Sequence, residues 1–216
     1  MTTGKFITLE GVEGVGKSTN LELVSRSVKA AGYDVLVTRE PGGTTLGERV
    51  REILLDKNEN QMTPMAELLL MFAARAQHVE EVIKPALARG TWVVSDRFTD
   101  SSYAYQGGGR QLGSKAVAKL ERQVLGDFGP DLVIILDLDV QAGLRRASKV
   151  SEADRFESEE KAFFERVRAA FVSRSTEPGY HLVDAALPLI EVQTNITTCL
   201  LYTSNAADHP LRVHPG

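Results

Sequence analysis

Short apolar runs and longer amphipathic segments alternate along most of this chain. The apolar runs are rich in Val, Ile, Leu and Phe and are bounded by Gly, Pro or charged residues, which is typical of strands. The predicted strands cover residues 5–10, 33–40, 91–96, 131–139 and 180–185. Two of them, 33–40 and 131–139, are apolar enough to predict buried strands.

Between these runs, apolar residues recur three and four positions apart, which predicts amphipathic helices. The predicted helices cover residues 17–32, 45–56, 65–88, 114–127, 140–147 and 161–174. Thr44 is placed to cap the second helix, and Gly90 ends the third. In the third helix a continuous apolar stripe is predicted from Leu69, Phe72, Ala76, Val79 and Ile83.

The alternation of five strands with helices predicts an α/β fold. The expected core is a five-stranded parallel sheet with helices on both faces. In such folds ligands bind at the carboxyl ends of the strands. The polar residues at those ends are expected to converge there, and they are Glu10, Arg39, Glu40, Asp96, Arg97, Asp137 and Asp139.

The C-terminal part of the chain has a different character. Residues 188–197 begin a predicted helix. In the segment that follows, apolar residues no longer recur at helical spacing, and two prolines occur. We therefore expect residues 1–197 to form a single domain and residues 198–216 to be a poorly packed tail. A reading-frame shift or an added segment would explain such a tail, and a short native C-terminal arm is the alternative.

The first predicted strand and helix are joined by Gly11-Val12-Glu13-Gly14-Val15-Gly16-Lys17-Ser18, the G-x-x-x-x-G-K-S pattern of a phosphate-binding loop. Its glycines let the backbone curl so that N–H groups point inward, and the helix N-terminus adds partial positive charge. Lys17 would reach the β- and γ-phosphates, and Ser18 would ligate Mg²⁺. A plain glycine-rich turn is the alternative, which the flanking strand and helix disfavour.

Composition narrows the class of protein. The chain has 25 basic and 29 acidic residues and a net charge of −4, so we expect no general polyanion-binding surface and no nucleic-acid partner. No apolar run reaches the roughly 18 residues that predict a membrane-spanning helix. Cys199 is the only cysteine, which excludes an internal disulfide and fits a reducing cytoplasm.

Arginines gather at positions where a second phosphorylated ligand would bind. Arg39 and Arg97 lie at the ends of predicted strands. Arg51 lies in the predicted helix 45–56, and Arg75 lies in the long helix. The planar guanidinium donates two parallel hydrogen bonds to phosphate. Singly, each could be a solvated surface residue. Together they favour a transferase with a phosphorylated acceptor over a hydrolase that uses water.

Five motifs resemble those of bacterial thymidylate kinases in their order and spacing. They are "GVEGVGKST", "TREPGGT", "MFAARAQH", "SDRFTDSSYAYQGGGR" and "DRFE", and the resemblance covers residues 5 to about 197. It implies a three-layer P-loop kinase fold with a short lid at about 145–157. It also implies a cytoplasmic enzyme, usually a homodimer, that transfers the γ-phosphoryl group of ATP to dTMP with Mg²⁺.

The resemblance also implies roles for individual residues. The ATP-binding set is Gly11, Val12, Glu13, Gly14, Val15, Gly16, Lys17, Ser18 and Thr19. The dTMP-binding set is Arg39, Glu40, Arg51, Phe72, Arg75, Arg97, Ser102, Tyr105 and Gln106. The catalytic set is Lys17, Glu13, Asp96, Arg146 and Arg155, and Mg²⁺ would be held by Ser18 and Asp96.

Within the dTMP set, Arg39, Arg51 and Arg97 match the residues that hold the phosphate. Arg75 matches the arginine that hydrogen-bonds the thymine, with Ser102 and Gln106 as further base contacts and Tyr105 against the deoxyribose.

Two features depart from the family pattern. The position four residues before Arg75, where relatives often carry the ring that stacks on thymine, is Met71, and Phe72 follows it. The predicted lid is also thinner in basic residues than many bacterial lids. Another nucleoside monophosphate kinase is the nearest alternative function. A nucleotide-dependent switch is the second, although the N-K-x-D string of GTPases does not occur.

Overall fold

The computed structural model describes residues 3–56, 62–148, 155–156 and 159–204. The strands are β1 (Phe6–Glu10), β2 (Val35–Arg39), β3 (Trp92–Asp96), β4 (Leu132–Asp137) and β5 (Tyr180–Asp184). The α-helices are α1 (Lys17–Ala30), α2 (Thr45–Leu55), α3 (Pro64–His78), α4 (Lys84–Ala88), α5 (Thr99–Ser102), α6 (Ser114–Leu125), α7 (Val140–Ala147), α8 (Lys161–Arg174) and α9 (Leu189–Ser204). Two π-helical segments are η1 (Val79–Ile83) and η2 (Tyr103–Gly109).

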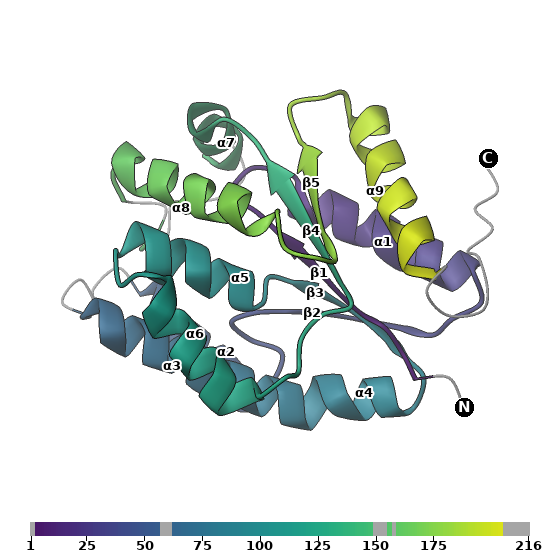
Figure 1. The fold of residues 1–216 in the computed structure, drawn as a ribbon, viewed down its shortest axis with the longest axis horizontal. Coiled ribbons are helices and arrows are strands. Elements are labelled where there is room, and N and C mark those ends of the chain that lie inside the picture. Colours follow the sequence, from purple (N-terminus) through teal and green to yellow (C-terminus); the bar gives the residue numbers. More distant parts are fainter. Residues whose placement is uncertain (1–2, 57–61, 149–154, 157–158, 205–216) are drawn as a thin grey trace.

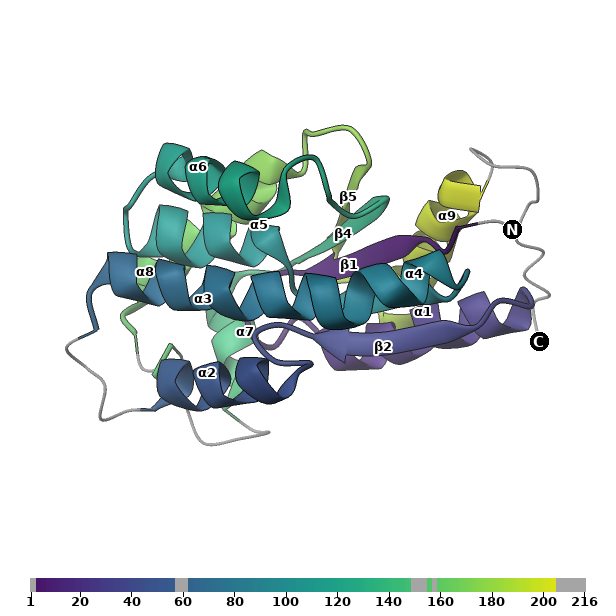
Figure 2. The same ribbon diagram turned by 90° about the horizontal axis from the view of Figure 1, so that it is seen from below.

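The five strands form one parallel sheet in the order β2-β3-β1-β4-β5, which confirms the predicted α/β class. Strand β1 is central, with β3 on one side and β4 on the other. Helices α1 and α9 cover one face of the sheet, while α4, η2 and α8 lie on the other (Figure 1). Helix α2 packs beside α3 at the periphery (Figure 2).

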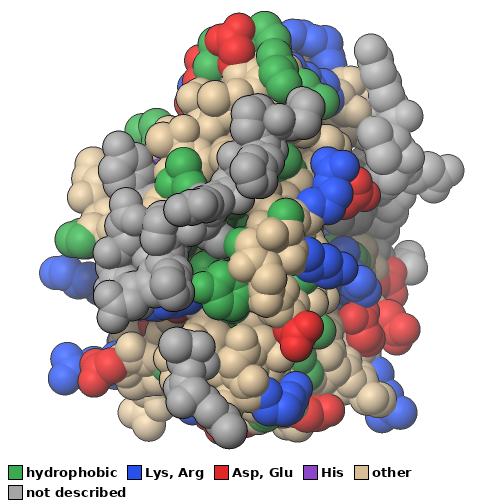
Figure 3. All heavy atoms as spheres, turned by 90° about the vertical axis from the view of Figure 1, so that its right-hand side faces the viewer, with side chains coloured by type: hydrophobic (Ala, Val, Ile, Leu, Met, Phe, Trp, Pro, Cys, Tyr) green, Lys and Arg blue, Asp and Glu red, His purple; other side chains and the backbone are tan. Residues whose placement is uncertain are grey.

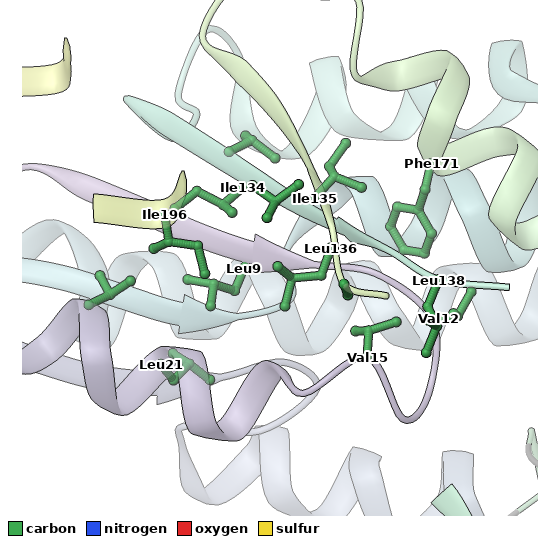
Figure 4. Close-up of a cluster of buried hydrophobic side chains, with 14 of the residues drawn as sticks. Leu9, Val12, Val15, Leu21, Ile134, Ile135, Leu136, Leu138, Phe171 and Ile196 are labelled. Carbon is green, nitrogen blue, oxygen red and sulfur yellow. The ribbon is translucent and has the colours of Figure 1, made fainter. Parts of the chain in front are cut away.

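The core lies where the central strands meet helices from both faces. All five residues of β1 are buried, and so are the first five of β4, because parallel strands covered on both sides see no solvent. In Figure 4, Ile196 of α9 and Leu21 of α1 approach these strands, and Phe171 of α8 lies on the far side of β4. This packing holds the carboxyl ends of β1 and β3 in place.

The prediction that residues 33–40 form a buried strand is wrong, because β2 lies at the edge of the sheet. It pairs with β3 alone, and Val37 is 48% exposed. The prediction of a buried strand at 131–139 is confirmed by β4. The run at 33–40 is also the less apolar of the two, and its place at the edge of the strand order leaves it more exposed.

The helix predicted at 65–88 forms as one continuous helical stretch from Pro64 to Ala88, but its middle, η1, is π-helical. The wider turn rotates the residues after it relative to those before it. The predicted apolar stripe is only partly correct, because Phe72, Val79 and Ile83 are buried whereas Leu69 is 51% exposed.

Two other local predictions can be compared with the structure. The predicted cap is confirmed, since Thr44 Oγ1 accepts a hydrogen bond of 2.9 Å from the Gly47 amide. The tail predicted from residue 198 is not seen in its first residues, because α9 continues to Ser204 and Cys199 and Leu200 are buried in the core. The remainder of that segment, residues 205–216, lies outside the described residues.

Basic and acidic side chains are interspersed on the face drawn in Figure 3. Within the described part of the chain, no helix is long and apolar enough to cross a membrane.

Candidate active site

The phosphate-binding loop runs from the end of β1 into α1, as predicted. Gly14 has a φ of 71° and lies so close to α7 that a side chain there would meet the Gly143 carbonyl oxygen at 2.1 Å. A residue with a Cβ would therefore push the loop away from α7. Val12 and Val15 point into the core and anchor the loop, which leaves its backbone on the outer side.

Lys17 is the first residue of α1, and its side chain folds back over the loop. Its Nζ donates to the carbonyl oxygens of Gly11 at 3.0 Å and Val12 at 2.9 Å. Burial and the nearby Arg97 guanidinium lower the pKa of Lys17 to about 8. Ser18 and Thr19 follow at the exposed helix N-terminus, where anions bind favourably.

Arg97 follows β3 and connects three parts of the site. Its φ is 71°, an uncommon conformation for a residue with a Cβ. Nη1 donates to the Gly11 carbonyl at 3.0 Å and to Ser101 Oγ at 3.1 Å, and Nη2 donates to Glu13 Oε1 at 3.2 Å and to Tyr105 Oη at 3.1 Å. Burial alone would lower the pKa of Arg97, but Tyr105 and Glu13 raise it above its ordinary value.

Tyr105 lies on η2 and links that segment to the phosphate loop. Its hydroxyl donates a hydrogen bond of 2.5 Å to Glu13 Oε1. Burial raises the pKa of Tyr105 well above its ordinary value, so the phenol stays protonated and remains a donor. The other carboxylate oxygen of Glu13, Oε2, is buried and has no hydrogen-bond partner among the described residues.

Glu10, at the end of β1, supports the site from beneath. It is fully buried, and its carboxylate accepts hydrogen bonds of 2.6 Å from the Phe98 amide and from the Ser101 hydroxyl. Burial and the nearby Asp100 raise the pKa of Glu10 to about 8. It thus positions the residues that follow Arg97 without lining the cleft.

Arg75 forms a buried polar wall of the site. Only 2% of its surface is exposed, and Nε donates to Glu40 Oε2 at 2.7 Å. Nη1 donates to Ser102 Oγ at 3.0 Å, and Nη2 donates to the Phe98 carbonyl at 2.9 Å. These contacts hold the guanidinium in one orientation while each Nη keeps a second N–H for a ligand.

These groups surround one cleft of about 510 Å³. Most residues predicted for the nucleotide sites line it, namely Glu13, Gly14, Gly16, Lys17, Ser18, Thr19, Glu40, Arg51, Arg75, Asp96, Arg97, Ser102, Tyr105, Gln106 and Arg146. The cleft thus combines a phosphate-binding loop with a polar wall and several arginines.

Comparison with known proteins decides the family. The thymidylate kinase family model matches residues 9–196. A thymidylate kinase of Pseudomonas fluorescens is 57% identical over 200 residues, which cover 92% of this chain and 95% of that protein. The thymidylate kinase of Teredinibacter turnerae is 51% identical over 92% of this chain and 98% of that protein. The chain belongs to the thymidylate kinase family.

A solved structure supports the same assignment. The crystal structure of thymidylate kinase from Ehrlichia chaffeensis matches with a TM-score of 0.73 and 29% identity, over 92% of this chain and 98% of that one. Members of this family are phosphotransferases that use ATP and typically Mg²⁺, which makes the cleft with its phosphate loop and arginines the candidate for the kinase site.

The structure brings Ser18 and Asp96, the residues predicted for Mg²⁺, into the lining of this kinase cleft. Asp96 Oδ1 is buried without a hydrogen-bond partner in the described part of the chain, so it is available to a cation or to water bound to one. No group of three or more His, Cys, Asp or Glu among the described residues could hold a metal ion. These residues therefore fit Mg²⁺ held mainly by nucleotide phosphates and water.

Three predicted substrate or catalytic side chains do not line the cleft. Arg39, 53% exposed, pairs with Glu48 at 2.9 Å on the outer surface of edge strand β2. Phe72 is buried in the core that α3 shares with η2 and α6, and Met71 lines the cleft in its place. Arg155 is buried and donates to Glu67 Oε2 at 2.6 Å, away from the phosphate loop.

Two predicted strand-end acids also have structural partners. Asp137 accepts hydrogen bonds of 2.7 and 2.8 Å from Arg168, and Asp139 caps α7 by accepting from the Ala142 amide at 3.1 Å. Neither lines the cleft, so the expected convergence of all strand-end polar groups is wrong for these two acids, as it is for Arg39.

Some residues that line the cleft were not predicted from the sequence. They are Pro41, Leu55, Phe98, Ser101, Ala147 and Phe156, while Met71 is the alternative to Phe72 at the position where relatives carry the stacking ring. Most are apolar, and nothing in the local pattern separates an apolar residue in a cleft from one in the core. Four of them do lie within the motifs quoted above, Pro41 in "TREPGGT", Phe98 and Ser101 in "SDRFTDSSYAYQGGGR" and Phe156 in "DRFE", and this was the available signal. The rest of the predicted lid, residues 149–154 and 157, lies outside the described residues.

Proposed function

We propose that this chain transfers the γ-phosphoryl group of ATP to dTMP, giving dTDP and ADP. The observation that carries the proposal is that the phosphate loop and a second set of arginines, Arg51, Arg75 and Arg97, line the same cleft. A hydrolase would need only the first of these. A kinase needs both, because the acceptor carries its own phosphate.

The phosphate loop would hold ATP, with Lys17 on the transferring phosphate and Ser18 toward Mg²⁺. When bound, Mg²⁺ would neutralise charge on the phosphate oxygens. Asp96 would position that ion through its free Oδ1 or through water. Arg146, which is exposed and lines the cleft beside the loop, is the candidate for the catalytic arginine. These groups supply positive charge and in-line geometry, which is most of what phosphoryl transfer requires.

At the acceptor end, Arg51 and Arg97 would hold the dTMP phosphate and Arg75 would face a thymine carbonyl oxygen. Tyr105 would pack against the deoxyribose, since its ring lines the cleft and its hydroxyl is already bonded to Glu13. Met71 would cover the base in place of Phe72, because of these two only Met71 lines the cleft. Glu40 belongs to the site as the partner that orients Arg75.

The test is acceptor-dependent release of ADP from ATP, measured with dTMP, dUMP, CMP and AMP. A clear preference for dTMP is expected. Preference for CMP or AMP would assign the chain to another nucleoside monophosphate kinase activity. ATP binding without acceptor-dependent turnover would instead favour a nucleotide-dependent regulator.

We further propose a cytoplasmic homodimer in which residues 1–197 form one kinase domain. Family resemblance supports the dimer, and the single cysteine fits the reducing cytoplasm. Light scattering coupled to gel filtration tests the assembly, because a homodimer has twice the 23.6 kDa mass of the chain.

A further inference from the structure

Glu67 is a fully buried carboxylate on α3 that lies just behind the cleft without lining it. Three side chains donate to it. Gln106 Nε2 donates to Oε1 at 2.8 Å, Arg110 Nε donates to both oxygens at 3.2 and 3.3 Å, and Arg155 Nη2 donates to Oε2 at 2.6 Å. Two guanidinium groups thus compensate for burying the negative charge, which would otherwise be costly.

The contact with Gln106 has a directional consequence. A carboxylate only accepts hydrogen bonds, whereas a side-chain amide has a donor end and an acceptor end. The nitrogen of Gln106 must therefore face Glu67, and its oxygen must point elsewhere. That oxygen, Oε1, is buried and has no partner among the described residues, and Gln106 lines the cleft. A buried acceptor without a partner is unfavourable until a donor arrives.

The pyrimidine bases differ in the atom that such an acceptor would meet. Ring nitrogen N3 of thymine and uracil carries a proton and is a donor, whereas N3 of cytosine is an acceptor. We propose that Glu67 is a positioning residue that holds the Gln106 amide with its oxygen toward the base, so that the site selects a pyrimidine with a protonated N3. This inference rests on the proposed function, since it concerns the acceptor of that same cleft.

The arrangement separates two parts of base recognition. Arg75, oriented by Glu40, offers only donors and would therefore donate to a carbonyl oxygen of the base. Gln106, oriented by Glu67, offers an acceptor and reads the neighbouring ring nitrogen. If residue 67 were an amide, it could pair with either end of Gln106, and the amide could then turn its nitrogen toward cytosine N3.

The experiment compares kcat/KM for dTMP with kcat/KM for dCMP in four proteins: the unmodified chain, E67Q, Q106L and the E67Q/Q106L double variant. One hydrogen bond of ordinary strength corresponds to about a tenfold change. We expect E67Q to lower the dTMP to dCMP ratio about tenfold. In the Q106L background the same substitution is expected to change the ratio less than about twofold, because its effect passes through Gln106.

E159Q is the matched control. Glu159 pairs with Arg110 in the same cluster, but the structure shows no bond from it to Gln106. E159Q removes one carboxylate from the network, and the dTMP to dCMP ratio is expected to stay unchanged. Thermal unfolding of each variant distinguishes a loss of folding from a loss of selectivity. If E67Q fails to fold, E67D keeps the charge but draws the carboxylate back from Gln106, and it should lower the ratio in the same direction.

The proposal is overturned if E67Q, or E67D in its place, lowers kcat/KM for dTMP and kcat/KM for dCMP by the same factor. It is also overturned if the ratio shifts as much in the Q106L background as in the unmodified chain, since Glu67 would then act on the fold in general. Failure of the unmodified chain to use dTMP would be a different result. It would overturn the proposed function, whereas an unaltered ratio in an active dTMP kinase would overturn only the role of Glu67.

Discussion

Nε of Arg75 donates a hydrogen bond of 2.7 Å to Oε2 of Glu40, and both side chains are almost completely buried. The other oxygen of Glu40 is 3.0 Å from His78 Nδ1, so the carboxylate is held at both ends. Because the remaining contacts of Arg75 go to Ser102 and the Phe98 carbonyl, its guanidinium is oriented before any ligand binds. Preorganised donors of this kind make base selection sensitive to a single residue.

Arg75→Met should compress the order of acceptor preference. In the unmodified chain we expect dTMP first, then dUMP at a loss of roughly 1–3 kcal/mol for one methyl group, and dCMP much lower. The substitution removes donors that face a carbonyl oxygen, so kcat/KM for dTMP and dUMP should fall more than for dCMP. Steady-state kinetics with the three acceptors measures this.

Thermal unfolding must accompany those kinetics, because Arg75→Met leaves Glu40 buried with His78 as its remaining side-chain partner among the described residues. Breaking a buried pair costs about 3–5 kcal/mol, and a folded fraction is needed to interpret the rates. Equal use of dCMP and dTMP by the unmodified chain would contradict the thymine-selective reading and indicate a general pyrimidine nucleotide kinase.

Lys17→Ala should lower kcat by about 10²–10³, the usual effect of removing one donor to a charge that develops in the transition state. Stability should change little, since the hydrogen bonds that Nζ makes within the described part of the chain go to the carbonyl oxygens of Gly11 and Val12. ADP release with saturating ATP and dTMP measures the rate. Lys29→Ala, on the exposed side of the same helix, is the control. Near-normal turnover of Lys17→Ala would refute the assignment of the phosphate loop.

Much of the fold follows from local patterns in the sequence. Helix α8 forms over the predicted residues 161–174, because its apolar residues recur at helical spacing between clear ends. The two π-helical segments, η1 and η2, were not predicted. Their wider turns depend on packing against other elements rather than on the local period. The edge position of β2 was also missed, since strand order arises from long-range pairing.

For the site, residue type and spacing located the phosphate loop and Arg75, but not the direction of every side chain. Phe72 and Met71 are adjacent on one helix, and only tertiary packing turns Phe72 into the core and Met71 toward the cleft. Arg155 was predicted from its motif, yet its partner Glu67 lies 88 residues away. The role of Glu67 could not be predicted, because it depends on groups brought together from three distant segments.

Arg97→Ala and Arg97→Gly should both weaken dTMP binding far more than ATP binding, as measured by calorimetric titration. They should differ in stability. The φ of 71° at this position suits glycine, whereas an alanine there is strained, so Arg97→Gly should be more stable in urea by about 1 kcal/mol. Equal losses of dTMP and ATP affinity would mean that Arg97 acts through the phosphate loop, which it contacts at Gly11 and Glu13.

Glu10 makes stability depend on pH in a direction that can be stated in advance. Its ordinary pKa is 4.5. In the folded chain burial, and to a smaller extent the charge of Asp100, raises its pKa to about 8. Between these values the folded state binds more protons than the unfolded state. The contribution of protonated Glu10 to the free energy of unfolding is therefore complete below about pH 4.5. It is lost as pH rises to about 8, at up to about 1.4 kcal/mol per pH unit.

Glu10→Gln should flatten that dependence, because an amide does not titrate. The substitution keeps the shape of the group, since the amide oxygen can accept from the Phe98 amide and the amide nitrogen can donate to Ser101 Oγ. Urea unfolding at pH 5, 6, 7 and 8 gives the slope for each protein. Glu22→Gln on the exposed side of α1 removes the same formal charge and should leave the slope unchanged. A slope in Glu10→Gln as steep as in the unmodified chain would show that other groups carry the pH dependence.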